Sequence, residues 1–217
     1  MTPRKSPELS IIVPVLNEAA GITAHLAMLA PLRAAGVELL VVDGGSTDAT
    51  MALARPLADT VLSAPRGRAT QMNIGAAHAR GATLLFLHAD TSLPPDAAAH
   101  IKVALAGGNA WGRFDVRISG QHPLLPVVAW AMNQRSRLTG IATGDQALFV
   151  RRAVFEQFGG FPELPLMEDI ALSRRLKRHS PPACLRAQVL TSGRRWEQHG
   201  VLRTILLMWW LRLAYFL

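Results

Sequence analysis

Short apolar runs alternate with segments of helical spacing through the first ninety residues, and this alternation most limits the folds open to the chain. Half of the 217 residues are hydrophobic, which is enough for a large core. Buried strands that alternate with amphipathic helices predict a mostly parallel sheet with helices on both faces. The expected strands are residues 10–15, 37–42, 60–62 and 84–87, and the expected helices are 18–32, 48–57 and 69–79.

Polar side chains follow the carboxyl ends of these expected strands. Asn17, Asp43 and Asp90 each stand just after an apolar run. Right-handed crossovers bring the ends of parallel strands to one edge of the sheet, which is where open α/β sheets bind ligands. We therefore expect these three side chains, distant in the sequence, to converge on one crevice.

After Asp90 the pattern is less regular but still alternates between helix and strand. We expect one α/β domain of Rossmann-like organisation over residues 9–200, preceded by a flexible polar stretch, 1–8. The later helices are expected at 95–106, 123–138 and 168–177, the later strands at 111–118, 146–150 and 183–190, and a glycine turn at 158–162.

Composition narrows the classes of partner and compartment. The single cysteine, Cys184, excludes an intramolecular disulfide, and the polar N-terminus lacks the apolar segment of a signal peptide. We therefore expect a cytoplasmic protein. The formal charge is +8 and most basic residues are Arg, a side chain suited to phosphate and carboxylate. These arginines are scattered and belong to no nucleic-acid-binding motif, so we expect no nucleic-acid partner.

The glycine-rich turn that follows Asp43 does not match the common nucleotide motifs. The chain has neither G-x-G-x-x-G nor G-x-x-x-x-G-K-[ST], which disfavours hydride transfer and P-loop chemistry. An α/β layout with carboxylates at strand ends suits nucleotide-sugar chemistry instead. Asp43 could accept a hydrogen bond from a base or ribose, or it could only order its own turn.

Five segments in order resemble family 2 glycosyltransferases, which have the GT-A fold. They are residues 10–18, 43–50, 67–77, 84–94 and 166–177, and the resemblance covers roughly residues 9–200. Residues 111–115 and 191–197 are similar to a bacterial subgroup associated with radical-SAM/selenodomain proteins, some members of which are assigned to arsenosugar biosynthesis. The resemblance implies a nucleotide-sugar donor, such as a UDP-sugar, and an inverting transfer.

The resemblance also implies which positions bind the donor. The segment after the first strand and Asp43 would hold the base and ribose, and Arg68 would contact the base or diphosphate at a helix N-terminus that favours phosphate. The expected donor-binding residues are Pro14, Leu16, Asn17, Glu18, Asp43, Ser46, Arg68, Asn73 and Ala89.

The segment His88-Ala89-Asp90 occupies the position of the family's Asp-x-Asp metal motif, so the resemblance implies Mn²⁺ or Mg²⁺ at Asp90. His88 departs from the pattern, because hard Mg²⁺ prefers oxygen and imidazole suits Mn²⁺ better. His88 could instead be a histidine packed at a strand end, and Asp90 could cap the next helix. His199 is a further candidate metal or phosphate contact.

Asp169 stands in the first turn of an expected helix, and the resemblance makes it the general base. The helix dipole favours its ionised form, although an acidic pair there could equally only stabilise the helix start. Arg194-Arg195-Trp196 resembles the Arg-Trp signature of processive members without its usual Gln, so polymer synthesis is not expected. The expected acceptor and diphosphate contacts are Asp145, Gln146, Glu168, Arg194, Arg195 and Trp196, with Asp145 equally able to be a turn residue.

The C-terminal stretch, 201–217, is apolar but includes Arg203 and Arg212 and is short for a membrane span. We expect an amphipathic helix that contacts a membrane, a partner or its own core. If it contacts a membrane, we expect it to lie on the inner face. The predicted activity is glycosyl transfer to a small or lipid-like acceptor. The alternatives are a sugar-phosphate nucleotidyltransferase and an inactive, membrane-associated nucleotide-sugar-binding module, and a homo-oligomer is possible for each.

Overall fold

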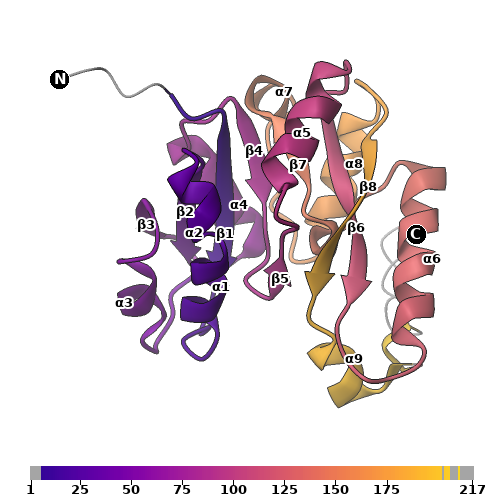
Figure 1. The fold of residues 1–217 in the computed structure, drawn as a ribbon, viewed down its shortest axis with the longest axis horizontal. Helices are drawn as coiled ribbons and strands as arrows, with labels where there is room; N and C mark the ends of the chain where they lie inside the picture. The colour runs from indigo at the N-terminus through magenta and orange to yellow at the C-terminus, as the bar shows by residue number, and fades with distance from the viewer. Residues whose placement is uncertain (1–5, 202, 206–209, 211–217) are drawn as a thin grey trace.

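The computed structural model describes residues 6–201, 203–205 and 210, and these form one mixed sheet covered by helices on both faces (Figure 1). The sheet has eight strands in the order β3-β2-β1-β4-β7-β6-β8-β5. This confirms the predicted α/β fold class. The expected helix at 201–217 lies largely outside the described residues, as do residues 1–5 of the N-terminal stretch.

The first half of the sheet is parallel, as predicted. Its strands are β1 (Leu9–Val15), β2 (Glu38–Asp43), β3 (Thr60–Ser63) and β4 (Thr83–Phe86). The connecting helices are α1 (Ile22–Met28), α2 (Ala30–Ala34), α3 (Thr50–Ala54) and α4 (Arg68–His78). The single helix expected over 18–32 is therefore wrong. A turn precedes Ile22, and Leu29 separates α1 from α2.

Alternate residues of β1 and β2 belong to two separate cores. Ile11 and Leu39 pack on the face that α1 covers, whereas Ile12 and Leu40 pack on the face that α4 covers. Because both faces of these strands are buried, their sequences are apolar throughout rather than alternating.

The second half of the sheet mixes directions, so the expectation of a mostly parallel sheet holds only for the first half. β7 pairs antiparallel with β4 and β6, β6 pairs parallel with β8, and β5 pairs antiparallel with β8. The elements are β5 (Thr91–Ser92), α5 (Ala97–Ala106), β6 (Trp111–Ile118), α6 (Leu125–Thr139), the 3₁₀ turn η1 (Gly144–Gln146), β7 (Phe149–Arg151), α7 (Arg152–Gln157), α8 (Glu168–Leu176), β8 (Ala183–Thr191) and α9 (Arg194–His199).

Four of these elements, β5, η1, α7 and α9, were not predicted, and the strand expected at 146–150 begins only at Phe149. Among the described residues, no helix has both the length and the apolar character needed to cross a membrane.

Helix α4 packs directly on the sheet through Gly75. A Cβ built on Gly75 would lie 2.5 Å from Ile12 Cγ2 and 3.0 Å from Val42 Cγ2. The absence of a side chain there lets the helix approach β1 and β2 closely.

Gly75→Ala is expected to destabilise the fold by about 1–3 kcal/mol, because overpacking outweighs the better helix propensity of alanine. Urea denaturation measures the change. Gly107→Ala is the control, since a Cβ on Gly107 meets only ordinary van der Waals contacts, the nearest at 3.4 Å, and the change should alter stability little. Equal stability of the Gly75 variant and the wild type would contradict the close approach.

Candidate active site

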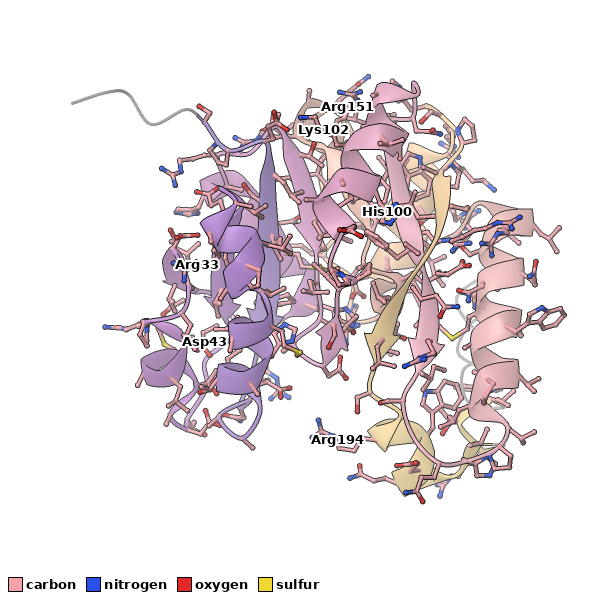
Figure 2. The ribbon with its side chains drawn as sticks, viewed as in Figure 1. Arg33, Asp43, His100, Lys102, Arg151 and Arg194 are labelled. Carbon is pink, nitrogen blue, oxygen red and sulfur yellow. The ribbon has the colours of Figure 1, made fainter. Side chains whose placement is uncertain are left out.

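A cavity of about 720 Å³ opens at the carboxyl ends of β1 and β4. Register places Val15 beside Asp43 and Ile12 beside Phe86, so these strands end at one edge, as predicted. Twelve of the expected site residues line the cavity: Pro14, Leu16, Glu18, Arg68, His88, Ala89, Asp90, Asp145, Glu168, Asp169, Arg194 and Trp196. Figure 2 shows Arg194 extending from α9 toward the N-terminal half of the molecule.

Five other expected residues do not line the cavity: Asn17, Asp43, Ser46, Asn73 and Gln146. The side chains of Arg195 and His199 lie outside the part of the chain that the structure describes, so their expected roles stay predictions.

Asp43 uses both carboxylate oxygens to order the turn that follows it. Its Oδ2 accepts hydrogen bonds from the N–H groups of Gly45 and Ser46 at 3.0 and 2.8 Å, and its Oδ1 accepts one from the Ser46 hydroxyl. Asn17 is tied to the same turn, since its Oδ1 accepts the Thr47 N–H at 2.9 Å. Of the two interpretations of Asp43, this geometry favours the turn-ordering one.

Asn73 and Gln71 both point from α4 into structural contacts. Asn73 exchanges two hydrogen bonds with the backbone of Phe161 and so holds the glycine turn. Gln71 Nε2 donates to the carbonyls of Val15 and Val42, both at 2.8 Å, where β1 and β2 end. Gln71 also lines the cavity, and sequence reasoning missed it. A polar residue on the buried face of an expected helix was the available signal.

Asp90 presents an exposed carboxylate to the cavity, with a 3.3 Å hydrogen bond from the Thr91 hydroxyl. Burial, and then the charge of Asp90, raise the pKa of Glu18, while Arg194 lowers it. Glu18, Asp90 and Arg194 thus face the same space.

His88 lies against the η1 turn. Its Nδ1 is 3.4 Å from Asp145 Oδ1, and its Cε1 and Nε2 occupy the space that a Cβ on Gly144 would need. The buried Nε2 has no hydrogen-bond partner among the described residues. This arrangement favours the packed-histidine interpretation, because Nε2 is buried against Gly144 although it has no hydrogen-bond partner in the described part of the chain.

Asp169 is held from two sides. Its Oδ2 accepts the Gly144 N–H at 2.7 Å, and its Oδ1 accepts the Ile170 N–H at 2.7 Å. The preceding Met167 has φ +68°, a strained backbone conformation of the kind that gathers at functional sites. Burial, and then Asp169, raise the pKa of the neighbouring Glu168, opposed by Arg68, whose NH1 lies 3.4 Å from Glu168 Oε1.

A buried polar network supports the η1 turn from behind. Gln146 Nε2 donates to Asn133 Oδ1 at 3.3 Å, and Gln146 Oε1 accepts from the Thr143 N–H at 3.2 Å. Arg113, fully buried, pairs with Asp115 and donates to the Asn133 carbonyl at 3.1 Å. Gln146 is therefore a support of the turn, not the acceptor contact expected from the sequence.

The described residues contain no group of three or more His, Cys, Asp or Glu side chains able to hold a metal ion by themselves. The available donors nevertheless fit an ion shared with a ligand. Asp90 offers an exposed carboxylate, and His88 offers an unpartnered ring nitrogen.

A family model, Glycosyl transferase family 2, matches residues 10–158. The chain belongs to this family. Curated relatives of this family 2 member include "PGL/p-HBAD biosynthesis glycosyltransferase" of Mycobacterium bovis and of Mycobacterium tuberculosis. These are 40% identical over 95 residues, which is 41% of this chain and 37% of theirs. The match therefore spans little more than a third of those relatives.

Solved structures share the fold at low sequence identity. S. aureus TarS 1-349 in complex with UDP-GlcNAc has a TM-score of 0.70 and 19% identity, covering 85% of this chain and 58% of that one. The mannosyltransferase PcManGT from Pyrobaculum calidifontis, in complex with GDP-Man and Mn2+, has a TM-score of 0.64 and 23% identity, covering 87% of this chain and 57% of that one. Glucosyl-3-phosphoglycerate synthase from Mycobacterium tuberculosis, in complex with Mn2+, UDP and phosphoglyceric acid, has a TM-score of 0.63 and 21% identity, covering 84% of this chain and 68% of that one. These likenesses confirm the GT-A fold.

Asp43→Ala is expected to destabilise the protein by roughly 1–3 kcal/mol in the absence of any nucleotide, because the turn N–H groups lose their acceptor. Thermal unfolding without ligand measures this. Asp96→Ala is the control, since Asp96 is exposed and its side chain makes no capping hydrogen bond. An unchanged midpoint for Asp43→Ala would show that the carboxylate is not needed for the turn.

The buried His25 of α1 predicts a pH-dependent stability. Burial lowers its pKa from 6.5 to about 4, against the opposing charge of Asp90. The unfolded chain then binds a proton that the folded chain does not, so stability should fall as pH drops from 6.5 toward 4, by about 3 kcal/mol. His25→Gln should flatten this part of the urea-denaturation profile, and an equally steep profile would contradict the assignment.

Proposed function

We propose that this family 2 member transfers a sugar from a nucleoside-diphosphate donor, probed first as a UDP-sugar, to the hydroxyl of a small or lipid-like acceptor, with inversion at the anomeric carbon. The observation that carries the proposal is that Asp90, which follows β4, and Asp169, in the first turn of α8, share one cavity although they are far apart in the sequence. One carboxylate is exposed, and the other is aligned by two N–H donors.

Donor binding is assigned to the N-terminal half of the cavity. Pro14, Leu16 and Glu18 at the end of β1 would contact the nucleoside, with the turn ordered by Asp43 behind them. Arg68 opens α4, where a helix N-terminus favours phosphate oxygens. Arg194 from the opposite side would contact the same diphosphate.

A divalent ion, Mn²⁺ or Mg²⁺, belongs to this proposal. Asp90 would hold it, and His88, which lines the same cavity, is the candidate second protein donor. When bound, the ion neutralises charge on the leaving diphosphate. Two structural neighbours were crystallised with Mn2+, and the imidazole makes Mn²⁺ the better matched ion here.

Asp169 is proposed as the general base that takes the acceptor proton. A base must be oriented toward the proton that it accepts, and the N–H donors of Gly144 and Ile170 fix the orientation of this carboxylate. The acceptor hydroxyl would then attack the anomeric carbon opposite the diphosphate. Asp145, Glu168 and Trp196 line the surrounding wall.

Three broader assignments accompany this mechanism. The domain extends over residues 9–200, the protein acts in the cytoplasm, and the 201–217 segment contacts a membrane, a partner or its own core, the last supported by Val201 and Ile205, which pack in or against the core. Residues 111–115 and 191–197 support membership of the radical-SAM/selenodomain-associated subgroup.

Asp169→Asn is expected to lower the turnover number at least about a hundredfold, because it removes the base. It should leave UDP binding intact, whereas Asp90→Ala should weaken Mn²⁺-dependent UDP binding by about tenfold or more, equal to 1.4 kcal/mol. Calorimetry with UDP, with and without Mn²⁺, measures the binding. Asp96→Asn, an exposed aspartate away from the cavity, is the matched control.

A screen of nucleotide-sugar donors tests the activity itself, with release of free nucleoside diphosphate as the readout. Full turnover by Asp169→Asn would remove the base assignment, and equal UDP binding by both variants would remove the division of roles. Pyrophosphate release from a nucleoside triphosphate and a sugar phosphate would identify a nucleotidyltransferase instead. Donor binding without any turnover would identify a binding module.

A further inference from the structure

The segment 164–167, Leu-Pro-Leu-Met, presents apolar side chains at the mouth of the cavity. Pro165 and Leu166 are exposed, Leu166 by 53%, and both line the cavity together with Met167. Loops are usually polar, and a run of exposed apolar residues is unfavourable unless a ligand or partner covers it.

This segment is fixed relative to Asp169. Met167, at φ +68°, ends it and is the N-cap of α8, so Pro165, Leu166 and Met167 are at most four residues from the proposed base. At its other end, Leu164 N–H donates to the Pro162 carbonyl at 2.8 Å, just after the turn that Asn73 holds.

The charged donor-side residues lie on other elements. Glu18 follows β1, Arg66 lies in the loop before α4, Arg68 begins α4, and Asp90 follows β4. A nucleoside diphosphate matches that charged side, and it has no comparable use for the apolar 164–167 segment. The remaining substrate, the acceptor, must bring a hydroxyl within about 3 Å of Asp169. The body of the acceptor then lies over the side chains nearest that carboxylate.

We propose that Pro165, Leu166 and Met167 bind an apolar acceptor body, aliphatic or aromatic, whose hydroxyl reaches Asp169. This rests on the proposed transferase function and names its acceptor class. Covering the exposed parts of Pro165 and Leu166 together removes apolar surface from water, which contributes enough to change affinity about tenfold. The segment is thus a determinant of acceptor specificity and takes no part in the chemical step.

The test compares acceptors that carry the same sugar hydroxyls on different bodies, methyl glucoside and octyl glucoside, both below the micellar concentration of the latter. Phenol and 4-heptylphenol form a second pair for an aromatic hydroxyl. In the wild type, the longer body should raise kcat/KM by about tenfold or more through the acceptor KM. Leu166→Ser should remove most of this preference and leave the donor KM unchanged.

Two variants control for a general loss of stability or activity that is unrelated to acceptor binding. Leu166→Met keeps an apolar side chain of similar volume and should retain the preference. Leu53→Ser changes a leucine on α3 that is 37% exposed and does not line the cavity, so it should behave as wild type. Thermal unfolding of each variant confirms that the fold is retained.

A second readout does not require turnover. Calorimetry with the wild-type protein and UDP should detect saturable binding of octyl glucoside or 4-heptylphenol, weakened about tenfold by Leu166→Ser. Transfer that is indifferent to the apolar body, or a Leu166→Ser variant with unchanged preference, overturns the inference and leaves the transferase function standing. Binding of wild type to vesicles of phosphatidylglycerol and phosphatidylcholine that is lost in Leu166→Ser, with unchanged acceptor KM, assigns the segment to a membrane and also overturns it. Absence of transfer from any donor refutes the proposed function itself.

Discussion

Burial of β1, β2 and β4 on both faces is the constraint on which the rest of the structure depends. Helices cover each face, so the polar groups of these strands can meet solvent only at their ends (Figure 1). At the carboxyl end, Gln71 satisfies the carbonyls of Val15 and Val42, and Gly44 N–H donates to the Val15 carbonyl as well. These hydrogen bonds pair the backbone carbonyls at the carboxyl ends of β1 and β2, beside the cavity, which would otherwise be buried without a partner.

Sequence reasoning recovered the parallel half of the fold because two-sided burial leaves a local signal. Continuous apolar runs such as residues 84–87 are visible without knowing their partners. The second half depends on partners far away in the chain. β5 is two residues long and exists through its pairing with Thr191 and Leu190, and α7 begins immediately after a three-residue strand. Neither has enough length for periodicity to indicate it.

The same distinction separates the site residues that were predicted from those that were missed. Asp90, Glu18 and Asp169 stand at strand or helix ends, where a polar residue after an apolar run is conspicuous. Gln71 and Asn133 act from within helices through hydrogen bonds to strands 17 or more residues away, and a polar residue on a buried helix face signals such a bond without identifying its partner. Gln146 was predicted to contact the acceptor together with its neighbour Asp145, but its side chain turns inward and donates to Asn133.

His88 packs closely on Gly144, and this contact limits which residues can replace either of them. Gly144 donates its N–H to Asp169 and leaves room for the imidazole ring only because it has no side chain. Any larger residue at 144 has to displace either the ring or the backbone that aligns the carboxylate. A smaller side chain at 88 removes the first obstacle. A side chain at position 144 therefore requires a smaller residue at position 88, so packing couples the two positions.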